Sequence, residues 1–320
     1  MNEPEVLKPL DIRDVQWDNE NLQDRNCPVC SSSSSRDWAI RPDSLKVQLC
    51  GECGLLFVSP APVESALNTF YSTYDNLPAN RAAADEVVIR KELLAVDPLT
   101  DVRIQTLSGH LDISKSSVLD VGCGRGDFLF LMKQLGCSVT GIDPDKAAIT
   151  IAKNIGIDNT LCGYLEDGKL SAKFDLIVLN DLVEHPLKPM ELLTTCLSLL
   201  KDNGMILIWT PNGDRVYSDQ ERITFRVDLE HMQYFTTEAI KSISTCLPLK
   251  IIHFEILGHS SLFGITASEQ PASIQLSSAL RGVARLFPGY SKLKQLRAKL
   301  QGNDLPQGNY QMFTLLRKEK

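Results

Sequence analysis

From about residue 117 onward, short apolar segments alternate with segments that carry apolar residues at helical spacing. The apolar segments span residues 117–121, 138–143, 160–163, 174–180, 205–210, 249–257 and 310–316, and the helical segments span residues 127–135, 144–154, 189–200 and 237–245. Strands that alternate with helices pair in parallel through right-handed crossovers. The pattern therefore predicts an α/β fold with a doubly wound, seven-stranded sheet.

The turn after the first strand is rich in glycine and leads directly into a helix. Its sequence runs from Gly122 through Cys123 and Gly124 to Gly126. Glycines let the backbone approach a ligand closely, and a helix N-terminus offers unbonded N–H groups. A dinucleotide-binding turn has a glycine or alanine where this chain has Asp127, whose charge would repel a pyrophosphate. The turn therefore indicates a nucleotide-type cofactor other than a dinucleotide.

Four of the nine cysteines form two closely spaced pairs. They are Cys27, Cys30, Cys50 and Cys53. Two such CxxC pairs complete a tetrahedral sulfur site for structural zinc. A redox pair is less favoured because no βαβ pattern surrounds either CxxC, and four unrelated buried cysteines are the remaining alternative. The cysteine spacing predicts a zinc ribbon over residues 1–60. Helical spacing of apolar residues predicts a helical link over 61–110, and the alternating strands and helices predict an α/β domain over 111–320.

Several motifs between residues 111 and 257 together resemble the class I S-adenosylmethionine-dependent methyltransferases. They are the glycine turn, TGID at 140–143, FDLIVLN at 174–180, the pair Glu184-His185, LKDNGM at 200–205 and TPN at 210–212. The resemblance implies a Rossmann-like methyltransferase sheet that binds S-adenosylmethionine. The cofactor-binding residues that it implies are Asp120, Gly122, Cys123, Gly124, Asp143, Pro144, Leu165, Glu166 and Asn180. Asp143 also lies 21 residues beyond Gly122, a spacing that suits an acid binding ribose hydroxyls.

The zinc ribbon, the link and the α/β domain together resemble the zinc-binding methyltransferases associated with sugars and glycans. In that group the segment corresponding to Asp228–Phe235 places a Glu-His pair, here Glu230 and His231, toward the substrate. The expected acceptor is therefore a small molecule or glycan that is methylated at a sugar-type hydroxyl. Such a hydroxyl needs a base at neutral pH, and His231 and His185 are the candidates.

Each of these histidines also has a purely structural interpretation as an ordinary loop residue. Asp181, Glu184 and His185 offer metal-ligand atoms in a short span, although polar residues after a strand more commonly form a loop. Two other functions remain open for the whole chain: a nucleotide-cofactor oxidoreductase or epimerase on a similar sheet, and a zinc-ribbon protein that binds nucleic acid. A cofactor-binding protein without catalytic activity is a third.

The charge of the chain disfavours nucleic acid as a partner. Lys and Arg total 33 against 40 Asp and Glu, which gives a net charge of −7. No run of about 18 apolar residues is present and the N-terminus lacks the pattern of a signal peptide, so the cytoplasm is the expected location. Within a predicted helical insertion at 265–305, residues 281–299 contain six basic residues and no acid. This segment is expected either to contact anionic lipid or a phosphorylated substrate, or to be a solvated lid face.

Overall fold

The larger part of the molecule is a seven-stranded mixed sheet. The computed structural model describes residues 5–6, 17–74, 87–88, 90–91, 94–168, 170–215, 229–257 and 311–319. In the large sheet the strands follow the order β13-β14-β11-β10-β7-β8-β9. They span Ser117–Val121 (β7), Ser138–Asp143 (β8), Thr160–Cys162 (β9), Phe174–Asn180 (β10), Leu200–Pro211 (β11), Leu249–Leu257 (β13) and Gln311–Lys318 (β14). Only β14 pairs antiparallel with its neighbours, so the predicted doubly wound sheet is confirmed.

Helices cover both faces of this sheet. One hydrophobic cluster contains side chains of α3 (Val102–Ser108), α4 (Asp127–Gln134) and α5 (Lys146–Ile155), and the other contains side chains of α6 (Pro189–Leu199) and α7 (Thr237–Cys246). Along β10, Leu176 and Val178 belong to the first cluster and Ile177 and Leu179 to the second. This alternation explains why the strand is apolar at every central position.

Two element boundaries differ from those expected from the sequence. The end of the helical link expected over 61–110 divides into a 3-10 turn, Pro98–Thr100, and α3, because the Asp101 side chain accepts the Arg103 backbone N–H and starts a new helix. Strand β11 begins at Leu200, which pairs with Phe174 beyond an irregularity in the register. Within the same helical link, residues 87, 88, 90 and 91 are helical, whereas residues 86, 89, 92 and 93 lie outside the described residues.

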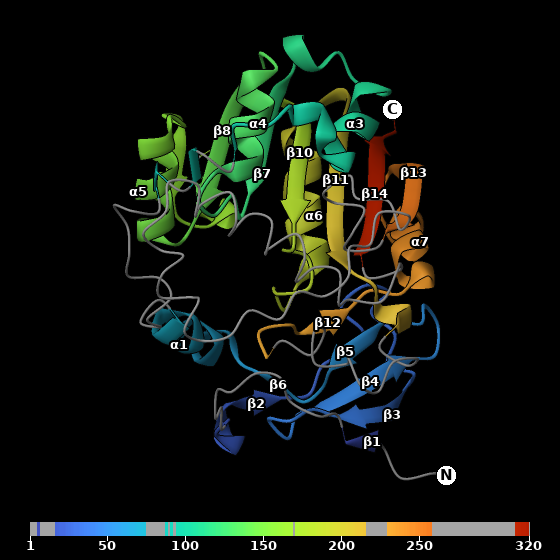
Figure 1. Cartoon of the computed structure of the whole chain (residues 1–320). Coiled ribbons are helices and arrows are strands. Elements are labelled where there is room, and N and C mark those ends of the chain that lie inside the picture. Colours follow the sequence, from blue (N-terminus) through green and yellow to red (C-terminus); the bar gives the residue numbers. More distant parts are fainter. Residues whose placement is uncertain are drawn as a thin grey trace, which may run out of the picture.

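The N-terminal part forms a second, smaller sheet below the first (Figure 1). Its strands follow the order β1-β3-β4-β5-β12. They span Glu5–Val6 (β1), Ser35–Ile40 (β3), Lys46–Cys50 (β4), Leu56–Val58 (β5) and Gln233–Tyr234 (β12). Strand β12 comes from the segment that follows β11, and it pairs antiparallel with β5. The small sheet therefore includes a piece of chain that belongs, in sequence, to the large domain.

Shorter elements lie outside these two sheets. They are β2 (Leu22–Gln23) paired with β6 (Ala61–Pro62), helix α1 (Glu64–Tyr74), and the 3-10 turns at Asn19–Asn21, Ile113–Lys115, Leu165–Asp167 and Gly213–Arg215. In Figure 1, α1 lies between the small sheet and the part of the large sheet that carries β8 and α5. Among the described residues no helix is long and apolar enough to cross a bilayer. Residues 265–305, including the basic segment 281–299, lie outside the described residues, and their partners stay a prediction.

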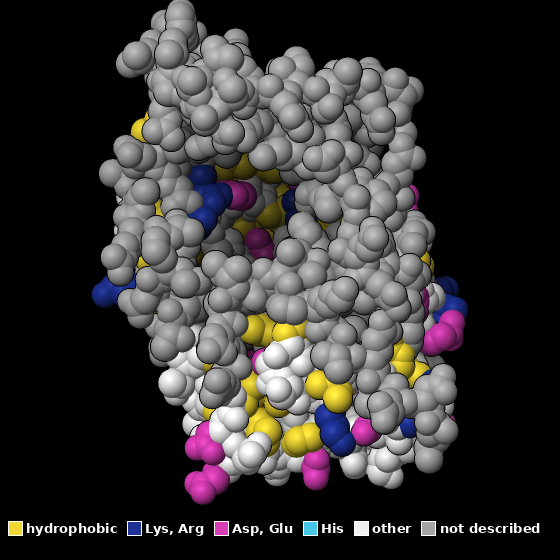
Figure 2. All heavy atoms as spheres, turned by 60° about the horizontal axis from the view of Figure 1, so that its bottom comes forward, with side chains coloured by type: hydrophobic (Ala, Val, Ile, Leu, Met, Phe, Trp, Pro, Cys, Tyr) yellow, Lys and Arg dark blue, Asp and Glu magenta, His cyan; other side chains and the backbone are white. Residues whose placement is uncertain are grey.

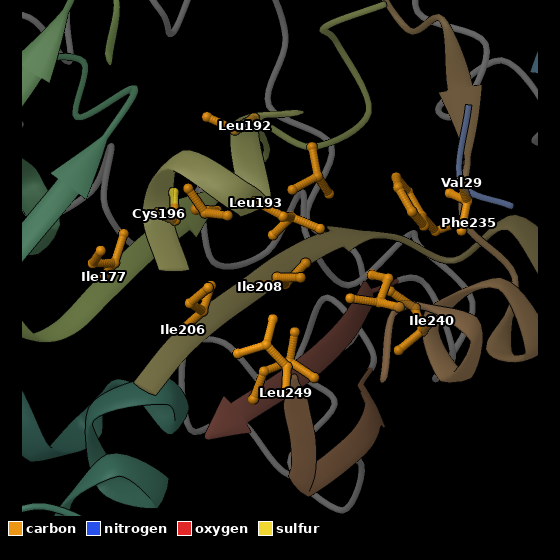
Figure 3. Packing of buried hydrophobic residues seen from close by; sticks show 14 of the residues in the cluster. Val29, Ile177, Leu192, Leu193, Cys196, Ile206, Ile208, Phe235, Ile240 and Leu249 are labelled. Carbon is orange, nitrogen blue, oxygen red and sulfur yellow. The ribbon is translucent and has the colours of Figure 1, made fainter. Parts of the chain in front are cut away.

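The two sheets share one hydrophobic core. Val29 and Phe57 of the small sheet region belong to the same buried cluster as Phe235 and Ile240. Figure 3 shows Val29 beside Phe235, with Ile240 and the side chains of α6 and β11 continuing the cluster. A small sheet that packs in this way holds the segment after β11 against the end of the large sheet. The boundaries expected near residues 60 and 110 stay predictions.

Candidate active site

Asp120, at the carboxyl end of β7, is a buried carboxylate at the glycine turn. The residue is only 2% exposed, and its Oδ1 has no hydrogen-bond partner among the described residues. Burial raises the pKa of Asp120 to about 8, and the negative charge of Asp143 adds to this rise while Arg103 opposes it. A buried carboxylate oxygen without a partner suits a ligand that carries a positive charge.

The three glycines of the turn all have positive φ but serve different purposes. A Cβ added at Gly124 (φ +51°) would meet nothing within 4 Å, whereas one at Gly126 (φ +83°) would lie 3.0 Å from Cβ of Ala152 in α5. The Gly124 N–H donates to Oδ2 of Asp143 over 2.8 Å. Gly124 therefore lies beside open space where a ligand can approach, and Gly126 allows close packing of two helices.

Asp143 ends β8 and is held in one orientation. Its Oδ1 accepts the backbone N–H of Asp145 over 2.8 Å, and Oδ2 accepts that of Gly124. The charge of Asp143 also acts on Tyr164, whose hydroxyl has a pKa that is raised by partial burial first and then by Asp143. These contacts place the predicted ribose-binding acid next to the predicted methionine-binding turn.

The other predicted cofactor residues differ in what they expose. Pro144 and Glu166 are exposed, while the side chain of Leu165 is buried in the hydrophobic core, so that only its backbone can face a ligand. The Cys123 side chain is also buried, and it lies against Gly141 of β8, where an added Cβ would be 2.7 Å from Sγ. Cys123 can therefore contribute its backbone alone.

Arg103 of α3 is a site residue that no sequence motif indicates. Its Nη1 donates to Oδ1 of Asn180, at the end of β10, over 3.1 Å, and Asp101 binds the guanidinium through both oxygens. The guanidinium carbon lies 4.8 Å from the ring centroid of Phe128 and 5.5 Å from that of Trp209. A single arginine in a helix carries no motif, and only the fold brings it to Asn180 and Asp120.

The molecule has a hollow in its surface. Figure 2 shows this hollow, in which acidic, basic and hydrophobic side chains are visible. At the strand ends, Asp120 and Arg103 are an acidic and a basic residue close enough for the charge of Arg103 to act on Asp120. A ligand with both an ammonium and a carboxylate group would match such a pair.

Two predicted histidines meet beside this edge of the sheet. The ring centroids of His185 and His231 are 4.8 Å apart, and the rings are inclined by 80°. One side-chain ligand atom from each of these histidines and from Glu184 all lie within 4.8 Å of one another. Oε2 of Glu184 accepts the hydroxyl of Thr210, at the end of β11, over 2.9 Å. Asp181, also considered from the sequence, does not join this cluster among the described residues.

The two histidines have different surroundings. His231 is 4% exposed, whereas His185 is partly exposed. Burial lowers the pKa of His185, although the charge of Glu230 and the backbone carbonyls of Glu230 and Asp181 act in the opposite direction. His185 is therefore neutral at neutral pH and can accept a proton. Glu230 acts electrostatically on His185, while the sequence places it beside His231.

The four predicted zinc ligands come together at one end of the small sheet. The Sγ atoms of Cys27 and Cys53 are 3.5 Å apart, as are those of Cys30 and Cys50, and all four lie within 4.8 Å of one another. The hydrogen bond from Cys53 lowers the pKa of Cys27 to about 5. Four clustered cysteine sulfurs, of which Cys27 has a lowered pKa, are a set of ligands that suits a tetrahedral zinc ion.

Comparison with known proteins identifies the large domain. Residues 97–247 match a family model described as a methyltransferase domain. This segment is a class I S-adenosylmethionine-dependent methyltransferase domain. The predicted family is thereby confirmed, and the alternative of an oxidoreductase or epimerase loses its support.

Curated relatives match the same part of the chain. A ubiquinone biosynthesis O-methyltransferase of Haemophilus ducreyi is 35% identical over 133 residues, which are 38% of this chain and 56% of the relative. One from Xanthomonas oryzae pv. oryzae is 31% identical over 130 residues, 38% of this chain and 53% of the relative. The chain thus spans about half the length of the curated relatives it matches. A crystal structure of a SAM-dependent methyltransferase from Archaeoglobus fulgidus aligns with 25% identity and a TM-score of 0.44, covering 68% of this chain and 93% of that one.

Proposed function

We propose that this protein transfers a methyl group from S-adenosylmethionine to a hydroxyl oxygen of a small-molecule or glycan acceptor. The observation that carries the proposal is the position of two groups of residues at one sheet edge. The glycine turn with Asp120 and Asp143 follows β7 and β8, and the pair of imidazoles follows β10 and β11. A donor site beside a proton acceptor is the arrangement that methylation of a weakly acidic hydroxyl requires.

The donor residues fit the charged groups of S-adenosylmethionine. The unpartnered Asp120 Oδ1 would accept the ammonium group, and the guanidinium of Arg103, held beside Asn180, would bind the carboxylate. Asp143 would accept the ribose hydroxyls, and the open side of Gly124 would leave room for the backbone to approach the ligand. The bound cofactor supplies an electrophilic methyl group on a sulfonium leaving group.

The acceptor side supplies alignment and a base. As the acceptor oxygen bonds to the methyl carbon and the carbon–sulfur bond breaks, the hydroxyl proton would pass to an imidazole nitrogen of His231 or its neighbour His185. The carboxylate of Glu184, fixed by Thr210, would stabilise the positive charge that then forms on the imidazole. Glu230 adds a further negative charge near His185.

Oxygen is the proposed acceptor atom for two reasons. The matched relatives are named O-methyltransferases, and an imidazole base is needed for a hydroxyl. A sugar-type hydroxyl is the finer proposal, because it ionises so weakly that it depends on a protein base. A phenol, with a pKa of about 10, depends on one less. The names of the relatives do not favour a sugar, so phenols belong in the test as the alternative acceptors.

A structural zinc ion is proposed for the small sheet, held by Cys27, Cys30, Cys50 and Cys53. A sheet of this size has little core of its own, and metal binding then contributes directly to its folding. The four thiolates would be fully used in a closed site, so the ion would have no open position for substrate. Its proposed contribution is to structure alone.

The first experiment measures binding of S-adenosylhomocysteine and of NAD by calorimetry. We expect binding of the former and none of the latter, and the reverse result would refute the proposed donor. The second follows transfer of a labelled methyl group to nucleotide sugars, lipid-linked glycans and catechol-type phenols. His231→Gln and His185→Gln should each lower turnover on the true acceptor, with a total effect of roughly 10²–10⁴ if the pair removes the proton.

The matched control is His110→Gln, because His110 lies beside His253 on another part of the sheet. This variant should keep both turnover and affinity for S-adenosylhomocysteine. The His231 and His185 variants should retain that affinity within a few fold, since the donor contacts are separate. Full turnover in both imidazole variants would remove them from the reaction.

A further inference from the structure

Arg41 is a completely buried arginine of the small sheet region that reaches the segment carrying His231. It follows β3, and its guanidinium is paired with Asp43 through Nε–Oδ1 at 3.0 Å and Nη2–Oδ2 at 2.7 Å. The same guanidinium donates to the backbone carbonyl of Leu229 over 2.6 Å and to the carbonyl of His231. The indole of Trp17 donates to Oδ2 of Asp43 over 2.8 Å and so fixes the acid.

A second arginine, Arg25, binds the same segment at Met232. Its Nη2 donates to the carbonyl of Met232 over 2.5 Å, and its Nη1 donates to the carbonyl of Leu187 over 2.9 Å. Its Nε donates to the carbonyl of Val58 in β5 over 2.8 Å. One side chain therefore connects the small sheet to the segments that follow β10 and β11.

The two histidine-bearing segments are also joined to each other. The amide nitrogen of Gln233 donates to the carbonyls of Val183 and Pro186 over 2.8 and 2.7 Å. The backbone N–H of Met232 donates to the carbonyl of Glu184 over 2.8 Å. Together with the pairing of β12 and β5, these bonds leave the backbone around His231 with few alternative positions.

The positions of the acceptor atoms distinguish Arg41 from an arginine that only fills space. The carbonyls of Leu229 and His231 belong to the peptide groups on either side of the Glu230-His231 pair. Holding both peptides restricts the direction of the Cα–Cβ bond of His231, from which the imidazole that lies against His185 projects. Burying a charged pair is costly and gains stability only with good geometry, and in some proteins such a pair serves to specify one arrangement of the chain.

We propose that Arg41 is a positioning residue for His231 and that the small sheet serves the acceptor half of the active site. The catalytic part of this inference rests on the proposed function, because it takes His231 to be part of the base. The geometric part, that Arg41 determines where the His231 imidazole lies, does not depend on it. Lysine cannot replace Arg41, since an ammonium group lacks the planar fork that reaches Asp43 and two carbonyls together.

The test compares Arg41→Lys with Arg36→Lys, a matched change at an exposed arginine of β3. The chain has five histidines, so their imidazole carbon signals can be followed by NMR at fixed pH and assigned with His231→Gln and His185→Gln. In Arg41→Lys we expect the His231 and His185 signals to shift or broaden while those of His110 and His253 stay in place. S-adenosylhomocysteine affinity should remain within about threefold, and turnover on an accepted substrate should fall at least tenfold.

Asp43→Asn is the second variant, because it keeps the arginine and weakens the contact that orients it. It decides the question if thermal melting shows that Arg41→Lys does not fold, and we expect the same two signals to move. Equal movement of all histidine signals, or unmoved His231 signals with wild-type turnover, would overturn the positioning role. Failure of the wild-type protein to bind S-adenosylhomocysteine would instead refute the proposed function. The NMR signals would then still test whether Arg41 positions the His231 imidazole.

Discussion

At the scale of single residues, Asp120 determines how donor binding should depend on pH. Its carboxyl group has a pKa of about 8, raised chiefly by burial, so at pH 7 it carries a proton in the ligand-free protein. Pairing with the ammonium group of a ligand favours the ionised form. The proton must therefore leave when the donor binds at pH 7, whereas an ordinary aspartate would release none.

We predict that S-adenosylhomocysteine binding at pH 7 releases close to one proton and strengthens as the pH rises toward 8. The gain is at most tenfold per pH unit. Above pH 8 Asp120 is already ionised in the ligand-free protein, so the proton release should decline there. Calorimetry in buffers of different ionisation enthalpy measures both. Asp120→Asn should abolish the release, and a wild-type protein that releases no proton at pH 7 would contradict the assignment.

Arg103 should contribute more to donor affinity than its position in an unremarkable helix suggests. We predict that Arg103→Gln weakens S-adenosylhomocysteine binding roughly 10–100-fold, which corresponds to the 1.5–3 kcal/mol typical of hydrogen bonds to charged groups. Arg103→Lys should lose less, since it keeps the charge but not the fork. Arg36→Gln is the control in the same binding assay. An unchanged dissociation constant in Arg103→Gln would exclude a contact with the donor carboxylate.

Arg103 also shows what sequence reasoning could not supply at this scale. Asp120, Asp143 and the glycine turn stand next to strands in a recognisable order, so their positions at one sheet edge follow from the pattern. Arg103 has no such signal, and its place beside Asn180 depends on how α3 packs on the sheet. The contact between His185 and His231 similarly joins two loops whose separate sequences say nothing about their distance.

At the scale of elements, the strand–turn–helix unit of β7 and α4 separates binding from packing within three residues. Gly124 and Gly126 both have positive φ, which costs an L-residue roughly 1–2 kcal/mol. Of the two, only Gly126 would in addition push a Cβ against Ala152 of α5, at 3.0 Å, and against Ile157, which follows α5, at 3.3 Å. Substitution by alanine at the two positions should therefore have different consequences.

We predict that Gly126→Ala lowers the free energy of unfolding more than Gly124→Ala does, because crowding in a packed region adds typically 1–3 kcal/mol. Gly124→Ala should instead reduce S-adenosylhomocysteine affinity with a smaller loss of stability, since its Cβ would enter the open space beside the turn. Urea unfolding and calorimetry on both variants provide the comparison. A larger loss of stability in Gly124→Ala would show that the open side of this glycine has been misassigned.

The elements also show how far periodicity predicts a fold. The strands and helices of the large sheet follow the expected pattern because each has an apolar face that matches its own period. The strands of the small sheet were not individually predicted, and β12 has only two residues. Its pairing with β5 is a long-range contact that no local pattern encodes. The cysteine spacing indicated the metal site without indicating the sheet around it.

At the scale of the whole molecule, the shared core should connect the proposed zinc ion to the stability of the methyltransferase domain. Cys27, Cys50 and Cys53 belong to the same buried cluster as Phe235 and Ile240. The hydroxyl of Thr236, which caps α7, also donates to the carbonyl of Gly54, over 3.0 Å. Loosening the cysteine cluster should therefore disturb the packing of α7 and of the segment after β11 together.

We predict that removing zinc, by chelation or by Cys50→Ser, lowers the temperature of a single cooperative unfolding transition. The drop should be roughly 5 °C or more, because a loss of a few kcal/mol moves the midpoint of a large domain by 2–4 °C per kcal/mol. Scanning calorimetry with and without added zinc is the measurement, and the zinc content of the purified protein should be one ion per chain. Cys162→Ser, at an exposed cysteine, is the control and should leave both values unchanged.

The number of transitions is the decisive part of this result. A small sheet that folds on its own would melt separately, giving a lower transition that depends on zinc and an upper one that does not. That outcome would contradict a core shared between Val29, Phe57 and Phe235, even if the metal were present. A single transition that shifts as a whole with zinc would mean that the donor-binding sheet depends energetically on the cysteine cluster, because the residues between them pack as one unit.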